Sequence, residues 1–238
     1  MTMTDTETGR GGARLRLPKG LHAFGNILSF LWKSPTSAFG LIVLGILIAT
    51  AVLGPLVAPY DPYAQDLQNT LAAPSATHWF GTDELGRDIL SRLLHGAAIT
   101  LRIIFLVTVV VGPVGMAVGT VAGYFGGRID TVLMRITDIF LSFPSLILAL
   151  AFVAALGPSL DNAIVAIALT AWPPIARLAR AETLTFRKAD YISAARLQGA
   201  SSARIIWKSI VPMCLPSVVI RLTLNMATVI LTAAGLGF

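Results

Sequence analysis

The sequence has few charged residues, one cysteine and no nucleotide-binding motif. Asp, Glu, Lys and Arg make up 13% of its 238 residues, whereas an ordinary soluble domain contains roughly 25%. Low charge combined with high hydrophobicity excludes a disordered chain. Cys214 is the only cysteine, which excludes an internal disulfide framework, and the three histidines have no zinc-ligand spacing. Neither Gly-x-x-x-x-Gly-Lys-Ser/Thr nor any Gly-Lys pair occurs, so the sequence contains no P-loop for ATP.

Hydrophobic residues, in contrast, make up 55% of the chain and gather in long runs. A helix needs roughly 20 mainly apolar residues to cross about 30 Å of hydrocarbon. The strand-like alternation of membrane barrels does not occur, so helices are the expected spanning structure. We therefore predict an all-α integral membrane protein, a polytopic helical bundle. Its five visible spans are 38–57, 103–123, 139–157, 160–176 and, interrupted by Arg221, 210–238.

The first run, 38–57, has the length of a retained transmembrane helix. A signal peptide is the alternative, but its apolar core is typically about 7–15 residues long. The run 38–57 is longer, and 37 polar or mixed residues precede it. We predict a tail over 1–37 followed by a first transmembrane helix over 38–57.

The distribution of positive charge predicts the orientation, because Lys and Arg concentrate in cytoplasmic loops. The tail 1–37, the loop 124–138 and the segment 177–209 together hold fourteen Lys and Arg residues, whereas 58–97 and 157–161 hold two. The N-terminus is therefore predicted to be cytoplasmic and the loop 58–97 external. The net charge of +6 is explained by these positively charged cytoplasmic segments between apolar runs, so no nucleic-acid partner is expected.

Three glycines lie on one face of the second span. Gly115, Gly119 and Gly123 follow one another at intervals of four residues, which removes side chains from that face and allows another helix to approach closely. The partner helix belongs either to this chain or to another subunit.

The segment 177–209 is too polar to enter the membrane but has the composition of a helix. Lys188 to Gln198 contains neither Gly nor Pro, and its alanines favour a helix. Gly199 is a helix stop, and Ser201 or Ser202 can cap a second short helix. Pro212 and Pro216 are predicted to end that second helix.

One face of the first of these helices carries mostly small side chains. Tyr191, Ala194, Ala195 and Gln198 stand at i, i+3, i+4 and i+7 and so share a face. Such a face suits insertion into a groove on another protein. An amphipathic hairpin resting on acidic lipid headgroups is the alternative, and the residues alone do not decide between the two.

Arg221, with Asn225 one turn later, is the candidate residue of a translocation pathway. If the fifth span starts near Ile210, Arg221 lies roughly 16 Å along the helix. A charge at that depth is costly and is expected to face a water-filled cavity or a partner. The alternative places 205–220 along the membrane interface, which makes Arg221 an anchor at the start of a span over 222–238.

Three stretches resemble a known family. They are Gly81-Thr82-Asp83-Glu84-Leu85-Gly86-Arg87-Asp88-Ile89-Leu90-Ser91-Arg92, Thr137 to Pro144, and Ala194-Ala195-x-x-x-Gly199 with Pro212 thirteen residues after the glycine. Together they are similar to the permease subunits of binding-protein-dependent ABC importers, specifically the C-type subunit of dipeptide and oligopeptide systems. The third stretch resembles the "EAA" loop that ABC importer permeases share. The resemblance covers about residues 30–238.

The resemblance implies a type I ABC importer permease, which usually has six spans, of which five are visible here. The transmembrane domain would cover 98–238 and include a cytoplasmic coupling hairpin over 181–212. The chain would be a non-catalytic subunit without a bound cofactor, since ATP and Mg would bind to one or two partner ATPase subunits. Its other partners would be a second (B-type) permease, an extracytoplasmic binding protein, the peptide and membrane lipid. Ser193 stands where the EAA pattern has glutamate, and Ala98 and Thr100 replace an arginine and a serine of the branch.

Within this family interpretation, residues 81–92 are expected to form an amphipathic helix of the external loop. Thr82 is the predicted cap, with acidic residues in the first turn. Asp83, Arg87 and Asp88 are predicted to form a structural ion cluster, and direct contact with the peptide is the less favoured alternative.

Two other function classes predict patterns of their own. A secondary transporter predicts paired intramembrane acids or repeated half-helices, and a membrane-embedded enzyme predicts paired catalytic groups at one depth. The sequence has neither pattern. Importers of nickel or glutathione remain alternatives within the resembled family.

Overall fold

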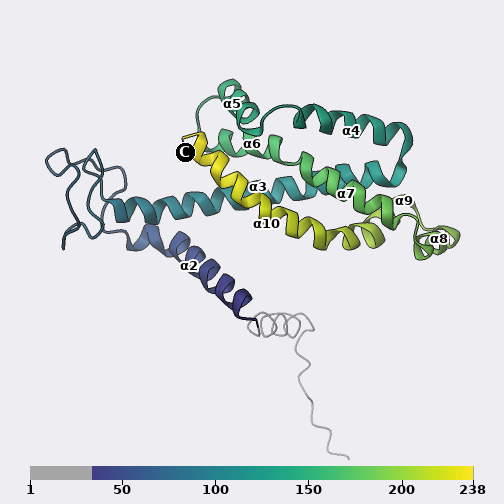
Figure 1. The fold of residues 1–238 in the computed structure, drawn as a ribbon, viewed down its shortest axis with the longest axis horizontal. Coiled ribbons are helices and arrows are strands. Elements are labelled where there is room, and N and C mark those ends of the chain that lie inside the picture. Colours follow the sequence, from purple (N-terminus) through teal and green to yellow (C-terminus); the bar gives the residue numbers. More distant parts are fainter. Residues whose placement is uncertain (1–33, 238) are drawn as a thin grey trace, which may run out of the picture. The chain divides into compact units, whose positions relative to one another are not determined.

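The computed structural model describes residues 34–237, which form helices joined by turns and one long loop (Figure 1). Across this part of the chain the only strand-like pairing is an isolated bridge between Thr82 and Asp88. The predicted all-α fold is therefore confirmed. The helices are α2 (Pro35–Val57), α3 (Ile89–Phe125), α4 (Gly127–Leu141), α5 (Ser145–Leu156), α6 (Leu160–Ala171), α7 (Pro173–Phe186), α8 (Asp190–Leu197), α9 (Ser202–Ile205), a π-helical turn (Ile206–Ile210) and α10 (Val211–Gly235).

The chain divides into two units, residues 1–50 and 51–238. The first unit contains most of α2, which exposes large apolar side chains such as Phe39 and Ile46. A helix that is apolar on all sides is typical of a membrane span. The predicted tail 1–37 lies mostly outside the described residues, together with the Lys and Arg residues of its first 33 positions.

Within residues 34–237, four continuous helical stretches are long and apolar enough to cross a membrane: Pro35–Val57, Ile89–Phe125, Leu160–Phe186 and Ser202–Gly235. They define a multi-pass membrane protein. The pair α4 and α5 passes the same test only when taken together, and the two helices are bent by 90°.

The predicted third span, 139–157, is thus not one straight helix. α4 already begins at Gly127, so most of the predicted loop 124–138 is helical. The bend falls at Ser142–Pro144. Pro144 has no amide hydrogen, and its ring disfavours the helical conformation at Phe143, which separates the two helices.

α3 and α7 form the most closely packed helix pair of the second unit (Figure 1). A Cβ atom added at Gly115 would lie 2.6 Å from the Ile175 side chain, and one at Gly123 would lie 2.7 Å from Thr183. At Gly119 it would lie closer still to the Ala176 carbonyl. The glycine face therefore contacts a helix of the same chain, which is the first of the two alternatives.

Buried apolar side chains continue this packing toward α6 and α10. The cluster includes Val107 and Val111 of α3, Ile167 of α6, Ile175 of α7 and Val218 of α10. Because these side chains come from four helices, the core fixes the positions of α3, α6, α7 and α10 relative to one another.

The predicted helix over 81–92, with Thr82 as its cap, is wrong. α3 begins at Ile89, and Asp88 caps it by accepting a 2.8 Å hydrogen bond from the Ser91 amide. Residues 81–88 fold back on themselves, with a turn at Glu84 and Leu85 and the bridge between Thr82 and Asp88, and Gly81 and Gly86 adopt left-handed φ values of 75° and 72°. Thr82 instead accepts a hydrogen bond from the Ala72 amide at 2.8 Å. The loop that precedes the second span therefore ends at Asp88, and 89–97 are helical.

Candidate functional site

Residues 187–210 leave the bundle and return after a turn at Gly199 (Figure 1). Gly199 has a φ of 79°, the left-handed conformation that favours glycine at the end of a helix. The Ser201 side chain then accepts a 3.3 Å hydrogen bond from the Arg204 amide and caps α9. The segment consists of two short helices bent at Gly199, as the sequence predicted.

The face of α8 that carries the small side chains is only partly exposed. Tyr191, Ala194 and Gln198 are exposed, whereas Ala195 is half-buried against the core beneath the helix. Leu197, which the sequence did not single out, is 90% exposed. α8 therefore exposes two large apolar side chains, Tyr191 and Leu197, which are available for contact with a partner.

A small core of its own holds α8 in place. Ile192 is fully buried with Ile205, Ile210 and Cys214, and Tyr124 of α3 packs against the cluster. The Arg196 guanidinium lies 5.2 Å from the centre of the Tyr124 ring. α8 is thus attached to the end of α3 by apolar packing. The spacing of Ile192, Ile205 and Ile210 did not predict this core, because its four buried members come from α8, α9, the π-helical turn and α10.

Pro212 and Pro216 do not end the second helix, contrary to the prediction. Pro212 lies in the first turn of α10 and Pro216 lies inside it. The preceding π-helical turn Ile206–Ile210 shifts the hydrogen-bond register, and the Val211 amide donates to the Ile206 carbonyl, five residues back. A proline in the first turn needs no amide partner, so the chain continues directly into α10. The predicted hairpin 181–212 is therefore continuous with the last span.

Two ion pairs join α4 to α7. Arg180 donates to both carboxylate oxygens of Asp130, at 2.5 and 2.6 Å. Arg177 donates to Asp138 at 2.6 Å. Asp138 and Arg177 lie 39 positions apart along the chain.

The predicted cluster of Asp83, Arg87 and Asp88 separates into two groups. Asp83 pairs with Arg87 at 2.8 Å and also with Arg92. Burial opposes ionisation of Asp83, but hydrogen bonds from the amides of Arg87 and Leu85 and from the Arg87 side chain outweigh it and lower its pKa to about 2.

Asp88 belongs to the second group and has no ion pair with Arg87. It is buried, accepts hydrogen bonds from the amide and hydroxyl of Ser91, and lies 3.0 Å from His78 Nδ1. Burial tends to raise the pKa of Asp88, but the hydrogen bonds from Ser91 and the proximity of His78 have the larger effect. The pKa of Asp88 is therefore lowered from its usual value. Asp83 thus connects the loop to Arg92 of α3, and Asp88 connects His78 of the loop to Ser91 of α3.

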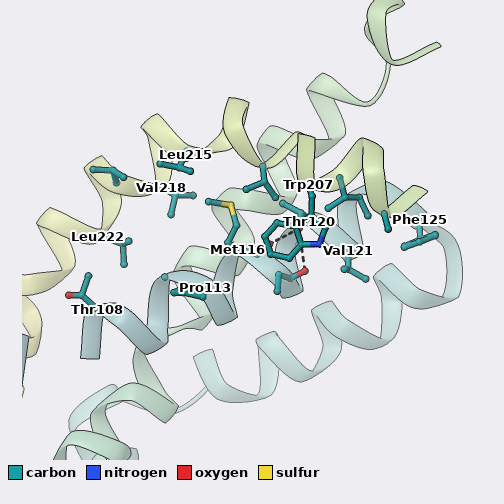
Figure 2. Close-up of a pocket in the computed structure, with 16 residues that line it drawn as sticks. Thr108, Pro113, Met116, Thr120, Val121, Phe125, Trp207, Leu215, Val218 and Leu222 are labelled. Carbon is teal, nitrogen blue, oxygen red and sulfur yellow. Dashed lines mark hydrogen bonds between the residues drawn. The ribbon is translucent and has the colours of Figure 1, made fainter. Parts of the chain in front are cut away.

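A groove of about 540 Å³ lies between α3 and the segment from α9 into α10 (Figure 2). Met116 and Phe125 line it from α3, and Trp207, Leu215 and Leu222 line it from the other side. Within the described part of the chain, no charged side chain lines this groove. A charged ligand would lose its hydration there without gaining a partner.

Arg221 and Asn225 line a second, more polar cavity of about 300 Å³. α10 runs without interruption from Val211 to Gly235, so the alternative in which 205–220 lie outside the last span is wrong. Arg221 lies roughly 15 Å from the start of α10, at 1.5 Å per residue. Thr228 and Thr232, which the sequence did not single out, also line the cavity, and the Thr232 hydroxyl donates a hydrogen bond to the Thr228 carbonyl.

Among residues 34–237, no group of three or more His, Cys, Asp or Glu side chains could hold a metal ion. The described residues therefore combine a bundle of long apolar helices, a bent segment outside it and a polar cavity beside a broken helix. This combination is that of a transport protein of the helical, multi-pass class.

Comparison with known proteins identifies the family. Residues 115–238 match the model of the binding-protein-dependent transport system inner membrane component, and residues 25–74 match the N-terminal transmembrane domain of oligopeptide transport permease C. The chain therefore belongs to the family of binding-protein-dependent transport system inner membrane components, in its C-type dipeptide and oligopeptide ABC permease branch.

Three curated relatives illustrate the range of the family. The dipeptide transport system permease protein of Alkalihalophilus pseudofirmus is 41% identical over 208 residues, covering 87% of this chain and 68% of the relative. The probable D,D-dipeptide transport system permease protein of Escherichia coli is 42% identical over 205 residues, covering 86% and 69%. The nickel transport system permease protein of Escherichia coli is 37% identical over 209 residues, covering 88% and 76%.

Proposed function

We propose that this chain is the permease subunit of an ATP-driven importer and forms, with a second (B-type) permease, the pathway for di- and oligopeptides. The relatives named for dipeptide transport, at 41% and 42% identity, support peptide as the substrate. The relative named for nickel, at 37%, supports the second candidate. An extracytoplasmic binding protein delivers the substrate to the external face of the cell membrane.

In this proposal the chain has no catalytic role. The sequence contains no P-loop, so ATP and Mg²⁺ bind to one or two partner ATPase subunits. The positive charge of the tail and of 177–209 supports a cytoplasmic N-terminus and a position of α8 on the same side of the membrane as these ATPases.

One observation carries the proposal: in this chain, which belongs to the permease family, α8 is attached to α3 by a buried apolar core. α8 exposes Tyr191, Ala194 and Leu197, while Ile192 on its other side is fully buried. A helix that transmits force needs an exposed surface for the partner and a packed connection to the transmembrane bundle. The core around Ile192 and Tyr124 supplies that connection to α3.

The test uses the complete importer, reconstituted in proteoliposomes with its ATPases and binding protein. The wild-type complex is expected to accumulate a labelled dipeptide when ATP is present. Ala194→Glu introduces a charge on the exposed face, and Gly199→Val strains the left-handed turn. Both are expected to lower uptake per ATP hydrolysed at least about tenfold, equivalent to ~1.4 kcal/mol of coupling.

Ser193→Glu is the matched control, since it adds the same charge to the same helix at an exposed position. It restores the glutamate of the resembled pattern and should leave coupling intact or improve it. Unchanged uptake in both Ala194→Glu and Gly199→Val would contradict the docking role of α8. ATP-driven uptake of nickel ion without uptake of dipeptide would select the second candidate.

A further inference from the structure

Four polar side chains form a stripe along the second half of α10. Arg221, Asn225, Thr228 and Thr232 stand at i, i+4, i+7 and i+11, which places them on one face of the helix. All four line the cavity of about 300 Å³ described above. Polar residues in an apolar span usually face a cavity or a partner, because lipid cannot satisfy them.

The opposite walls of this cavity come from the broken helix and from the α6–α7 junction. Phe140 and Leu141 end α4, Ser145 begins α5, and Thr170 and Pro174 flank the junction of α6 with α7. The bend of 90° between α4 and α5 turns α5 away from the line of α4, and the cavity lies beside this break. Its volume is at the lower end of the range of small-ligand sites.

Arg221 differs from several other arginines of the helices in having no carboxylate partner. Arg102, Arg177 and Arg180 form ion pairs with aspartates. Within residues 34–237, neither an ion pair nor a side-chain hydrogen bond of Arg221 or Asn225 is present, although both line the cavity. A guanidinium at this depth needs water or an anion.

We propose that this cavity binds a carboxylate of the transported peptide, with Arg221 as the charged donor and Asn225 beside it as a neutral donor. A guanidinium presents paired donors that match the two oxygens of a carboxylate, and the threonine hydroxyls can bind the adjacent peptide group. The inference rests on the proposed peptide import and adds the residues that recognise the substrate within the membrane.

Two other cavities are less suitable for a carboxylate. The groove between α3 and α10 has no charged lining residue among those described. A cavity of about 400 Å³ near the loop contains Arg87 and Arg92, but both already pair with Asp83.

The first experiment compares ATP-driven uptake of a dipeptide with uptake of its C-terminal amide, which lacks the charge. It uses the reconstituted importer with binding protein saturated by each peptide, so that the binding protein does not decide the outcome. The wild type is expected to prefer the carboxylate by roughly 10- to 100-fold, the range of a charged hydrogen bond. Arg221→Gln should abolish this preference and Arg221→Lys should retain part of it.

Arg102→Gln is the matched control, because Arg102 is a partly exposed arginine in a long span that pairs with Asp161 and does not line the cavity. It should keep the preference of the wild type. A preference that survives in Arg221→Gln overturns the inference and leaves the peptide permease proposal intact. Loss of complex assembly in both Arg221 variants also overturns it, because Arg221 would then bind a partner subunit.

The second experiment does not depend on transport. Asn225→Cys, in the assembled complex, is treated with a water-soluble maleimide, and the fully buried Cys214 of the wild type gives the background. Labelling is expected, and the dipeptide at millimolar concentration should slow it several-fold more than the amide does. If the introduced cysteine of the Asn225→Cys variant is not labelled, the inference is overturned whatever the uptake assay gives. If it is labelled and the dipeptide protects it, but no ATP-driven uptake occurs, only the proposed function is overturned.

Discussion

α10 carries two stripes of side chains with the same spacing and opposite chemistry. Val211, Leu215, Val218 and Leu222 line the apolar groove, and Arg221, Asn225, Thr228 and Thr232 line the polar cavity. The two stripes lie roughly 80° apart around the helix axis. The apolar stripe runs from Val211 to Leu222, and the polar stripe runs from Arg221 to Thr232, so the two overlap by less than a turn.

The apolar stripe contributes to the stability of the fold, and the polar stripe is available for function. Val218 is buried in the main core with Val107 and Val111, where every lost contact costs folding energy. Arg221 is exposed to the cavity and makes no ion pair within the described residues. A substitution in the apolar stripe should therefore lower the stability of the fold, whereas one in the polar stripe should mainly weaken recognition of the substrate.

The strongest test exchanges the two chemistries. Val218→Arg places an unpaired charge in the core and should reduce the free energy of unfolding by about 3–5 kcal/mol. Arg221→Leu removes a charge that has no partner and should leave stability unchanged or higher. Thermal unfolding of the purified protein in detergent measures both. Equal destabilisation by the two variants would remove the distinction between the stripes.

The second test applies the comparison to α3, with one substitution at two glycines. Gly119→Ala places a Cβ against the backbone of α7, where an overpacked contact costs about 1–3 kcal/mol. At Gly96 a Cβ meets nothing within 4 Å, and alanine should stabilise the helix by up to about 1 kcal/mol. The two melting temperatures should therefore move in opposite directions, and a shared direction would contradict the packing of α3 on α7.

The third test concerns the loop, where ion pairs replace packing. The folded-state pKa of Asp83 is lowered from 3.8 to about 2. Its ionised form therefore stabilises the loop fully above the unfolded value, and the contribution is lost as the pH falls through about 2. Asp83→Asn should increase proteolytic cleavage within 58–88 at neutral pH. Glu84→Gln, at an exposed neighbouring carboxylate, is the control and should leave cleavage unchanged.

The smallest effect is expected at the ion pair between Arg102 and Asp161. Both side chains are more than half exposed, so neutralising either one should cost about 0.2–1 kcal/mol. Adding 1 M salt to the wild type should have a comparable effect, because screening weakens exposed pairs. A loss well above this range in the melting experiment would mean that the pair is shielded from water.

Local features of the fold were predictable, and features that depend on distant contacts were not. The long apolar runs and the bend at Gly199 follow from composition and from the properties of glycine. The interruption of the third span at Pro144 had a visible signal, the proline itself, which was overlooked. Thr82 was chosen as a cap because it precedes two acidic residues, but Gly81 and Gly86 form turns that delay the helix to Ile89.

The candidate sites show the same division. Arg221 and Asn225 were identifiable from their depth in an apolar run, and Thr228 and Thr232 share their periodicity and could have been added. The continuity of α10 through Pro212 was not predictable, because it depends on the π-helical turn before it. Ile192 was missed as the anchor of α8, since its neighbours come from other helices.

The order of apolar and charged residues along this chain determined that it enters a membrane and where its long apolar runs lie, and three short motifs determined that it resembles a peptide permease. Each of these properties depends on residues close together in the sequence. The tertiary structure decided that α3 packs on α7, that α8 is attached through Ile192, and that Arg221 shares a cavity with Phe140 and Ser145. These contacts join residues dozens of positions apart, and they depend on how side-chain shapes fit together, which local composition does not encode.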